Sequence, residues 1–185
     1  MLSKIITGSP GTGKHTVAKI LAKELDLKLI DINKIAIQSG IFEKKDETLD
    51  IDVQKLEKLL AKKITKKSLV VGHLAPYVVS RKQVEIAVVL RKSPYKLGLI
   101  YRKRKYSHQK SIENIGSEIL GVTHYDAISE FGADKTFQID TTSKSVSKVV
   151  KTIKNLFVKG VLEEDEVDWL DLISEKNDLK RFFPY

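Results

Sequence analysis

Gly8-Ser9-Pro10-Gly11-Thr12-Gly13-Lys14 is the stretch that decides the fold, because it has the spacing of a phosphate-binding P-loop. It follows a strand-like run, Leu2 to Thr7, and precedes apolar residues that share one helical face. The glycines let backbone N–H groups turn inward around a phosphate, and the following helix adds the positive end of its dipole. We therefore predict that the phosphate-binding residues of this loop are Gly8, Gly11, Thr12, Gly13 and Lys14.

The residue after the lysine departs from the general motif: it is His15, and the expected hydroxyl comes one residue later, at Thr16. In most P-loop enzymes the first hydroxyl binds Mg²⁺, for which an imidazole is a poor substitute because this hard cation prefers oxygen. We expect both residues to lie near the phosphates, with Thr16 as a candidate Mg²⁺ ligand. For His15, a catalytic role competes with simple donation to a phosphate.

Composition predicts one well-cored domain, since the chain has 185 residues of which 42% are hydrophobic. It contains no cysteine, no apolar run long enough to cross a bilayer and no signal-peptide pattern. We expect a cytoplasmic protein with no membrane contact, and a monomer by default.

The net charge of +9 is unevenly distributed along the chain. From Gly160 onward there are eight acidic and three basic residues, a net of −5, so the first 159 residues carry +14. Arg91 to Lys110 contains eight basic residues and no acidic one. Such a block attracts nucleotides, RNA or an acidic partner, and the alternative is a solvated lysine-rich face.

Apolar segments recur at intervals long enough to hold a helix, which predicts an alternating α/β fold. We expect a P-loop protein with a five-stranded parallel sheet and helices on both faces, as in nucleoside monophosphate kinases. Ligands then belong at the carboxyl ends of the strands. The predicted strands are Leu2 to Thr7, Leu27 to Ile32, Ser68 to Gly72, Ile86 to Leu90 and Thr136 to Ile139.

Two segments look inserted into this kinase-like domain, which we place at residues 1–159. One, about residues 31–60, is the candidate acceptor-binding segment and leads into a helix capped by Asp50 or Asp52. The other, about residues 101–115, is the basic candidate lid and leads into a helix. Small kinases use two such segments, one to hold the acceptor and one to close over it.

The chain resembles the adenylate kinase isoenzyme six family, known in humans as the coilin-interacting nuclear ATPase, from Ile5 to about Trp169. Besides the loop, the matching residues are Leu49-Asp50-Ile51-Asp52, Gly72-His73, Leu90-Arg91, Arg104-Lys105-Tyr106-Ser107, Lys110, Glu113-Asn114 and Glu118. The resemblance implies weak adenylate kinase activity and ATPase activity, with ATP, AMP or ADP, and Mg²⁺. It also implies a small-subunit ribosomal protein as partner during small-subunit maturation and rRNA processing, with pre-ribosomal RNA as a second candidate.

The same resemblance suggests roles for three residues. Arg104 matches the lid arginine, and its planar guanidinium suits phosphate oxygens; the alternative is a surface arginine. His73 matches a histidine linked to ATP hydrolysis, and the alternative is a structural histidine bonded to the backbone. Transfer to AMP needs no general base, because the attacking oxygen is already an anion. Lys14 and Arg104 would therefore align and neutralise the phosphates, and we predict Lys14, His73 and Arg104 as the catalytic residues.

Two departures from the family weaken the expected metal and acceptor sites. Val71 stands where many members carry a Mg²⁺-ordering carboxylate, and Asp31 is a substitute by location, or else a helix cap or an acceptor-site residue. None of the five arginines lies in residues 33–60, which leaves Lys34, Lys44 and Lys45, or Arg91. A lysine lacks bidentate geometry, so we predict a slow kinase that binds AMP weakly.

Residues 160–185 form the last predicted unit, an acidic helix with an apolar side followed by a tail. Its single tryptophan, Trp169, is expected to be a packing anchor. Leu179 to Tyr185 resembles a sliding-clamp-binding peptide with Lys176 in place of its glutamine. The competing expectations are that the tail docks on its own domain or that it binds nothing.

Three functions remain open at this point. The first is an ATPase with adenylate kinase capacity whose cycle times release from a pre-ribosomal partner. The second is a housekeeping nucleoside monophosphate kinase. The third is a nucleotide-gated module that binds RNA or protein.

Overall fold

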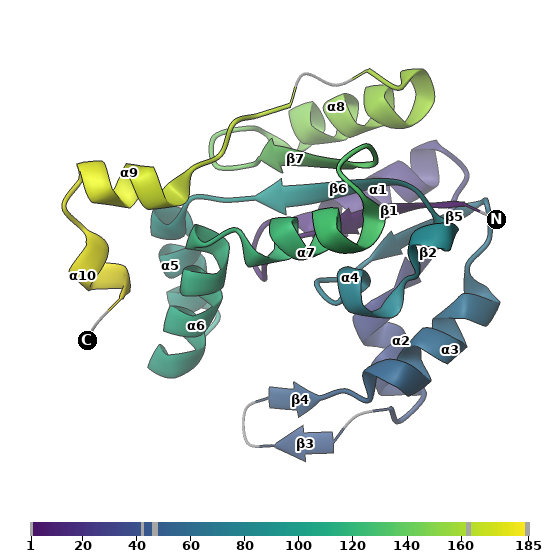
Figure 1. Ribbon diagram of the computed structural model, residues 1–185, viewed down its shortest axis with the longest axis horizontal. Coiled ribbons are helices and arrows are strands. Elements are labelled where there is room, and N and C mark those ends of the chain that lie inside the picture. Colours follow the sequence, from purple (N-terminus) through teal and green to yellow (C-terminus); the bar gives the residue numbers. More distant parts are fainter. Residues whose placement is uncertain (1, 42, 46–47, 162–163, 184–185) are drawn as a thin grey trace.

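The computed structural model describes residues 2–41, 43–45, 48–161 and 164–183. Five parallel strands form its central sheet in the order β2-β5-β1-β6-β7 (Figure 1). The register places Ile5 of β1 between Val70 of β5 and Ala87 of β6. All five strands were predicted, and their bounds are β1 Ser3–Thr7, β2 Lys28–Asp31, β5 Ser68–Val71, β6 Val84–Arg91 and β7 Thr136–Asp140.

Helices cover both faces of this sheet, and each face has its own hydrophobic cluster (Figure 1). On one face, α1 (Lys14–Glu24) and α8 (Val146–Lys159) pack against Ile6, Val88 and Leu90. The opposite face is covered by α2 Ile32–Gln38, α3 Val53–Lys63, α4 Ala75–Val78 and α7 Val122–Phe131. β5 is buried along its whole length because both of its faces are covered, as its continuous apolar sequence indicated. The predicted α/β P-loop fold is confirmed.

The candidate acceptor segment consists of α2, the short antiparallel strands β3 (Glu43–Lys45) and β4 (Thr48–Asp50), and α3. Asp52 caps α3, since its carboxylate accepts the backbone N–H of Lys55 at 3.0 Å. The other predicted cap, Asp50, and the predicted AMP contacts Lys44 and Lys45 lie outside the residues whose side chains the structure describes.

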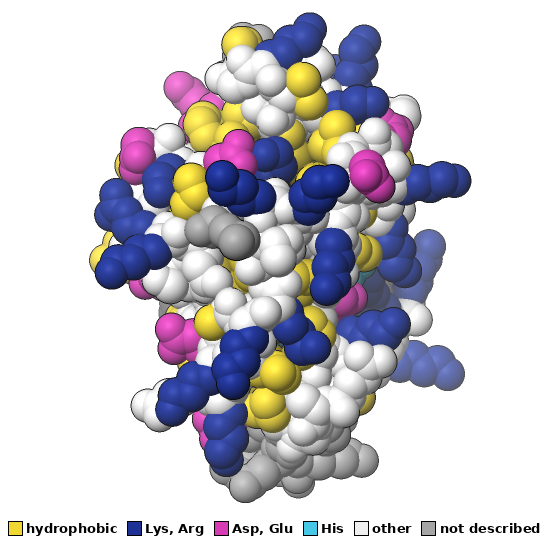
Figure 2. Space-filling model, turned by 90° about the vertical axis from the view of Figure 1, so that its right-hand side faces the viewer, with side chains coloured by type: hydrophobic (Ala, Val, Ile, Leu, Met, Phe, Trp, Pro, Cys, Tyr) yellow, Lys and Arg dark blue, Asp and Glu magenta, His cyan; other side chains and the backbone are white. Residues whose placement is uncertain are grey.

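The candidate lid is a helical hairpin. It is formed by α5 (Pro94–Lys103) and α6 (His108–Ile119), and the turn between them carries Arg104. Tyr101 and Tyr106 stack within the hairpin, with ring centroids 5.2 Å apart. The predicted basic block is only partly exposed: Arg91 is buried in the protein, while Arg102, Lys103 and Lys105 are exposed. On the face drawn in Figure 2, lysine and arginine side chains are spread widely and outnumber the acidic ones.

The acidic stretch of the C-terminal segment differs from the prediction, because residues 164–168 are not helical. The carboxylates of Glu164 and Asp165 instead accept backbone N–H groups of the edge strand β7, from Gln138 at 2.8 Å and Asp140 at 2.9 Å. Four acidic side chains at the start of a helix would be favourable, but unpaired edge N–H groups offer direct hydrogen bonds. The predicted member of this run at Glu163 lies outside the described residues.

The end of the chain docks on the lid hairpin. Helices α9 (Trp169–Glu175) and α10 (Leu179–Phe182) close a third cluster with Leu97, Tyr101 and Ile115. Trp169 anchors this contact, and Phe182 is buried edge-on against Tyr95 at 5.2 Å. Phe182 is therefore not displayed for a sliding clamp in this conformation; Pro184 and Tyr185 lie outside the described residues. The remaining short helix is the 3₁₀ turn η1, Arg81–Gln83.

Within the described parts of the chain, the helices are too short or too polar to cross a bilayer.

Docking of the C-terminal helices is expected to contribute substantially to stability, because Ile173 is fully buried between α9 and the hairpin. We predict that Ile173→Ala lowers the free energy of unfolding by about 2–4 kcal/mol in a urea titration. Leu170→Ala, at an exposed position of the same helix, is the control and should change it by less than about 0.5 kcal/mol. Equal effects of the two substitutions would contradict the docking.

Candidate active site

The P-loop joins the carboxyl end of β1 to α1 and depends on glycine at its first position. Gly8 has φ 133°, and a Cβ there would lie 2.3 Å from the carbonyl oxygen of Leu90 in the neighbouring strand β6. Gly13, at φ 94°, is the left-handed residue that precedes Lys14, the first residue of α1. A side chain at Gly8 would push the loop off the sheet, so the loop can start here only with glycine.

Lys14 is held under the loop rather than extended into solvent. It is only 4% exposed, and its Nζ donates to the carbonyl oxygen of Ser9 at 3.1 Å. Burial lowers the pKa of Lys14 to about 8, and the nearby positive charge of Arg104 acts in the same direction. An ammonium group in this environment lacks a full counter-charge, which a phosphate would supply.

A cavity of about 780 Å³ opens in front of the loop. It is bounded by the P-loop with the start of α1, by the end of β5, by the acceptor segment and by the lid. The lining residues used below are Lys14, His15, Thr16, Asn33, Ile37, Ile51, Val53, His73, Arg104, Lys110, Glu113 and Asn114.

The predicted loop residues divide into two groups in the structure. Gly11, Gly13, Lys14, His15 and Thr16 line the cavity, whereas Gly8 and Thr12 lie behind the loop surface. Thr12 is buried because its hydroxyl donates to the Ser9 carbonyl oxygen at 3.0 Å. Its own carbonyl oxygen accepts from the Thr141 hydroxyl at 3.1 Å. Thr12 therefore shapes the loop, while the lining residues face the cavity.

His73 follows β5 directly and lines the same cavity as Lys14. Burial is the main reason that its pKa falls to about 4, and the positive charges of Lys14 and His15 lower it further. Among the described residues no group forms a hydrogen bond with its ring, so the backbone bond of the structural alternative is not present. A neutral imidazole facing the phosphate region is able to accept a proton or a hydrogen bond.

His15 forms a pair that the sequence spacing alone did not indicate. Its Nε2 lies 3.4 Å from Oδ2 of Asp31, the residue that ends β2. The other Asp31 oxygen caps α2 by accepting the N–H of Lys34 at 3.1 Å. Partial burial works to raise the pKa of Asp31, but the hydrogen bonds from His15 and the Lys34 backbone outweigh it and lower the pKa. Asp31 thus caps α2, which was one of the predicted alternatives for this residue. It is also the partner of His15.

The described residues of this site do not form a carboxylate cage for a Mg²⁺ ion. Val71 is fully buried in the sheet, and in the described part of the chain no cluster of three or more acidic, histidine or cysteine side chains is suited to a metal. The Thr16 hydroxyl lines the cavity, and the Asp31 carboxylate stands behind His15. This donor set fits Mg²⁺ that keeps several waters and binds chiefly through substrate phosphates.

The lid contributes positive charge at the opposite wall of the cavity. Arg104 is the C-cap residue of α5, and its exposed side chain lines the cavity. Lys110 also lines it and lies over the Tyr106 ring, 4.8 Å from the centroid. Lys14, Arg104 and Lys110 therefore surround one space from two different segments, as anionic ligands require.

The part of the acceptor wall that the structure describes is much less basic. Its described lining is provided by Asn33, Ala36, Ile37, Ile51 and Val53. The Oδ1 atom of Asn33 is buried, with no hydrogen-bond partner among the described residues. This wall therefore offers apolar contacts and one free acceptor, but no guanidinium.

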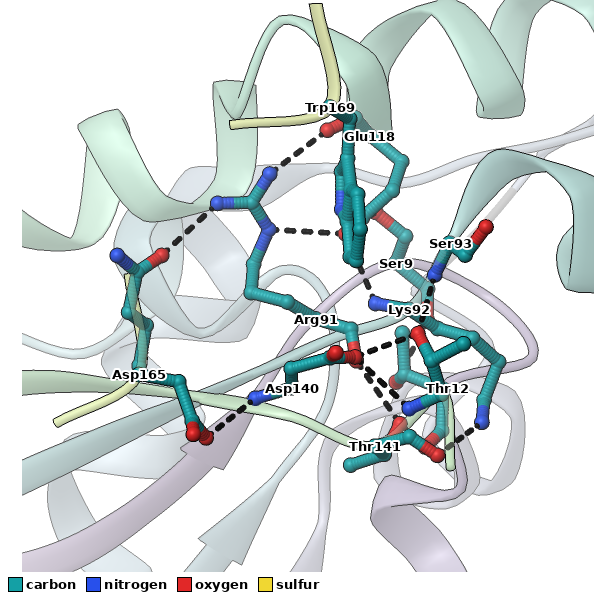
Figure 3. A network of polar contacts seen from close by, with 12 residues as sticks. Ser9, Thr12, Arg91, Lys92, Ser93, Glu118, Asp140, Thr141, Asp165 and Trp169 are labelled. Atoms are coloured by element: carbon teal, nitrogen blue, oxygen red, sulfur yellow. Dashed lines mark hydrogen bonds and ion pairs between the residues drawn. The ribbon is translucent and has the colours of Figure 1, made fainter. Parts of the chain in front are cut away.

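Arg91 does not supply the missing arginine, contrary to the prediction. Its Nε donates to Oε1 of Glu118 at 2.8 Å, and its Nη1 donates to Gln138 at 2.9 Å. The Arg91 and Glu118 side chains are buried, so the charge of Arg91 is neutralised inside the protein (Figure 3). The sequence had marked Glu118 only as a family position, and no spacing indicated that its side chain turns inward.

Comparison with known proteins agrees with this geometry. The sequence model of the AAA domain family matches residues 5–121. A protein of Thermococcus kodakarensis named "Putative adenylate kinase" is 31% identical over 172 residues, which cover 92% of this chain and 94% of the relative. A protein of Saccharolobus solfataricus with the same name is 33% identical over 162 residues, covering 86% and 85%.

Solved structures agree at the level of the fold. Shikimate kinase from Acinetobacter baumannii has a TM-score of 0.59 and 19% identity, with 88% of this chain and 96% of that chain covered. A gluconokinase from Sinorhizobium meliloti has a TM-score of 0.53 and 13% identity, covering 100% and 98%. The chain therefore belongs to a family of P-loop phosphotransferases, matched by the AAA domain model and represented by these adenylate kinase relatives.

Proposed function

We propose that the protein binds ATP in this cavity and transfers its γ-phosphoryl group slowly to AMP, forming ADP, or to water. The observation that carries this proposal is the placement of Lys14, His73 and Arg104 around one cavity whose acceptor wall has no arginine. The positive charges of Lys14 and Arg104 support the binding of ATP. The lack of an arginine to bind the phosphate of AMP supports slow turnover of AMP.

Each of these side chains has a defined part in the proposed reaction. The P-loop amides and Lys14 hold the outer phosphates, and Arg104 neutralises charge from the lid side as the phosphoryl group moves. His73 orients an attacking water in hydrolysis. Mg²⁺, held by the phosphates with Thr16 and Asp31 nearby, would neutralise phosphate charge when bound.

We further propose that this cycle serves maturation of the small ribosomal subunit in the cytoplasm, together with a small-subunit ribosomal protein and pre-ribosomal RNA. Support comes from the family resemblance at residues 49–52 and 104–118. The widely spread lysine and arginine side chains in Figure 2 also suit an RNA-containing particle.

The direct experiment measures ADP formation from Mg-ATP, with and without AMP and with and without a basic small-subunit ribosomal protein. Lys14→Ala should lower every turnover by about 100-fold or more, because it removes a phosphate ligand. Lys19→Ala, on an exposed position of the same helix, is the control. Wild type should show a KM for AMP near 1 mM or above. Fast turnover at micromolar AMP, unaffected by the ribosomal protein, would instead identify a housekeeping kinase.

Substitution of His73 should separate the two reactions. We predict that His73→Ala lowers ATP hydrolysis about 10- to 100-fold, because water needs an acceptor for its proton. The same variant should keep AMP phosphorylation within about threefold, since the AMP phosphate is already an anion. Single-turnover assays with and without AMP measure both rates on one preparation. Equal losses in both reactions would contradict the assignment of His73 to water.

The low pKa of Lys14 predicts pH-dependent binding of ATP. In the protein without nucleotide, Lys14 loses its proton near pH 8. Bound phosphates raise the pKa of Lys14, so the binding of ATP above pH 8 is accompanied by uptake of a proton. The affinity should fall roughly tenfold between about pH 7.5 and about pH 9.5 in calorimetric titrations. Lys14→Arg stays protonated over this range and should lose the pH dependence. A wild-type affinity that is constant with pH would contradict the prediction.

A further inference from the structure

A buried carboxylate at the end of the lid joins the P-loop to the C-terminal segment. Glu118, in the last turn of α6, is 2% exposed. Its Oε1 accepts from Arg91 Nε at 2.8 Å, from the Lys92 backbone N–H at 3.1 Å and from the Trp169 indole Nε1 at 3.0 Å. Its Oε2 accepts from the Ser9 hydroxyl at 2.5 Å, and Figure 3 shows these donors converging on it. Both oxygens are therefore occupied by donors from other segments.

On the P-loop side, the Ser9 contact bears directly on the phosphate-binding lysine. The Ser9 hydroxyl is tied to Glu118, while the Ser9 carbonyl oxygen accepts from Lys14 Nζ at 3.1 Å and from the Thr12 hydroxyl at 3.0 Å. The position of Ser9 thus sets both the turn of the loop and the place of the ammonium group. A displacement of Ser9 would move Lys14 relative to the cavity.

On the C-terminal side, the segments that flank Trp169 in sequence are both attached to the domain. Asp165, upstream, is attached to β7 through the Asp140 N–H. Downstream, Ile173 and Phe182 are buried against the lid hairpin. The docked segment therefore positions the indole N–H of Trp169 at Glu118, and Trp169 is only 8% exposed. Residues 164–182 are thus linked to the loop through Glu118, although none of them is among the described residues that line the cavity.

Helix α6 connects the same carboxylate to the lid wall. Lys110, Glu113 and Asn114 line the cavity from this helix, and Glu118 lies about one turn beyond Asn114. The hydrogen bonds of Glu118 thus hold α6 at a defined position relative to the loop.

We infer that Glu118 and Trp169 are positioning residues for phosphate binding: the docked C-terminal segment holds Ser9, through Glu118, in the geometry that presents Lys14 to the cavity. This inference rests on the proposed binding of ATP at the P-loop. Its distinctive consequence is that a residue of the C-terminal segment controls affinity for a ligand that it does not touch.

Trp169→Phe tests the link while keeping an aromatic ring in the cluster. The variant removes one of the four donors to Glu118, and the three that remain keep the carboxylate compensated, so the chain should still fold. We expect the Kd for ATP, measured by calorimetry, to rise about fivefold or more. Phe182→Leu is the matched control: it disturbs the same packing cluster without a bond to Glu118, and its Kd should stay within about twofold of wild type.

Ser9→Ala approaches the same link from the loop and leaves the C-terminal packing untouched. We expect a similar rise in Kd, and the double variant should bind no more weakly than the weaker single variant, because both changes break one chain of contacts. Additive effects, or a Trp169→Phe variant with wild-type Kd, would overturn the inference while the proposed function stands. Equal weakening by Trp169→Phe and Phe182→Leu would also overturn it, since loss of packing would then be the cause. If wild type binds no ATP, the proposed function and this inference both fail.

Discussion

The buried ion pair of Glu118 and Arg91 is the interaction on which the arrangement of the site depends. A carboxylate removed from water is strongly unfavourable unless charged or polar donors replace its hydration, and here the guanidinium, a backbone N–H, a hydroxyl and an indole do so. Because these donors come from separate segments, the pair can be satisfied only when the lid helix, the P-loop, β6 and α9 are in place together. Loss of either charged partner would leave the other uncompensated, at a cost of about 3–5 kcal/mol.

The same pair explains the uneven electrostatics of the cavity. With Arg91 neutralised inside the protein, the lysine and arginine side chains among the described lining residues are Lys14, Arg104 and Lys110, all on the P-loop and lid sides. Burial is the main reason that the pKa values of Lys14 and His73 are lowered; the charge of Arg104 also lowers the pKa of Lys14, and the charge of Lys14 lowers that of His73. Phosphate groups would stabilise the charged form of Lys14. The described part of the acceptor wall, which includes Ile37, Ile51 and Val53, contributes no such charge for a second phosphate.

The C-terminal segment is integrated into the catalytic domain rather than appended to it. Its acidic residues terminate the edge of the sheet at β7, and its apolar residues complete the core of the lid hairpin. This segment carries a net negative charge, opposite to that of the remaining chain. Its carboxylates bind the backbone of β7, and its apolar side chains pack on the lid hairpin.

The sequence by itself determined the fold class, because the patterns that specify it are local. Recurring apolar segments marked all five strands, two of them continuous, and the glycine spacing marked the P-loop, whose first glycine, Gly8, lies against Leu90. The motif spacing predicted the loop residues and the family resemblance predicted Arg104, and both Lys14 and Arg104 line the cavity. Only the tertiary structure decided where Arg91, Asp31 and the acidic tail residues point. Their partners, Glu118, His15 and the β7 backbone, are distant in sequence. Which partner a charged side chain binds depends on which groups the fold brings close to it and on how deeply they are buried, and a local sequence pattern contains neither.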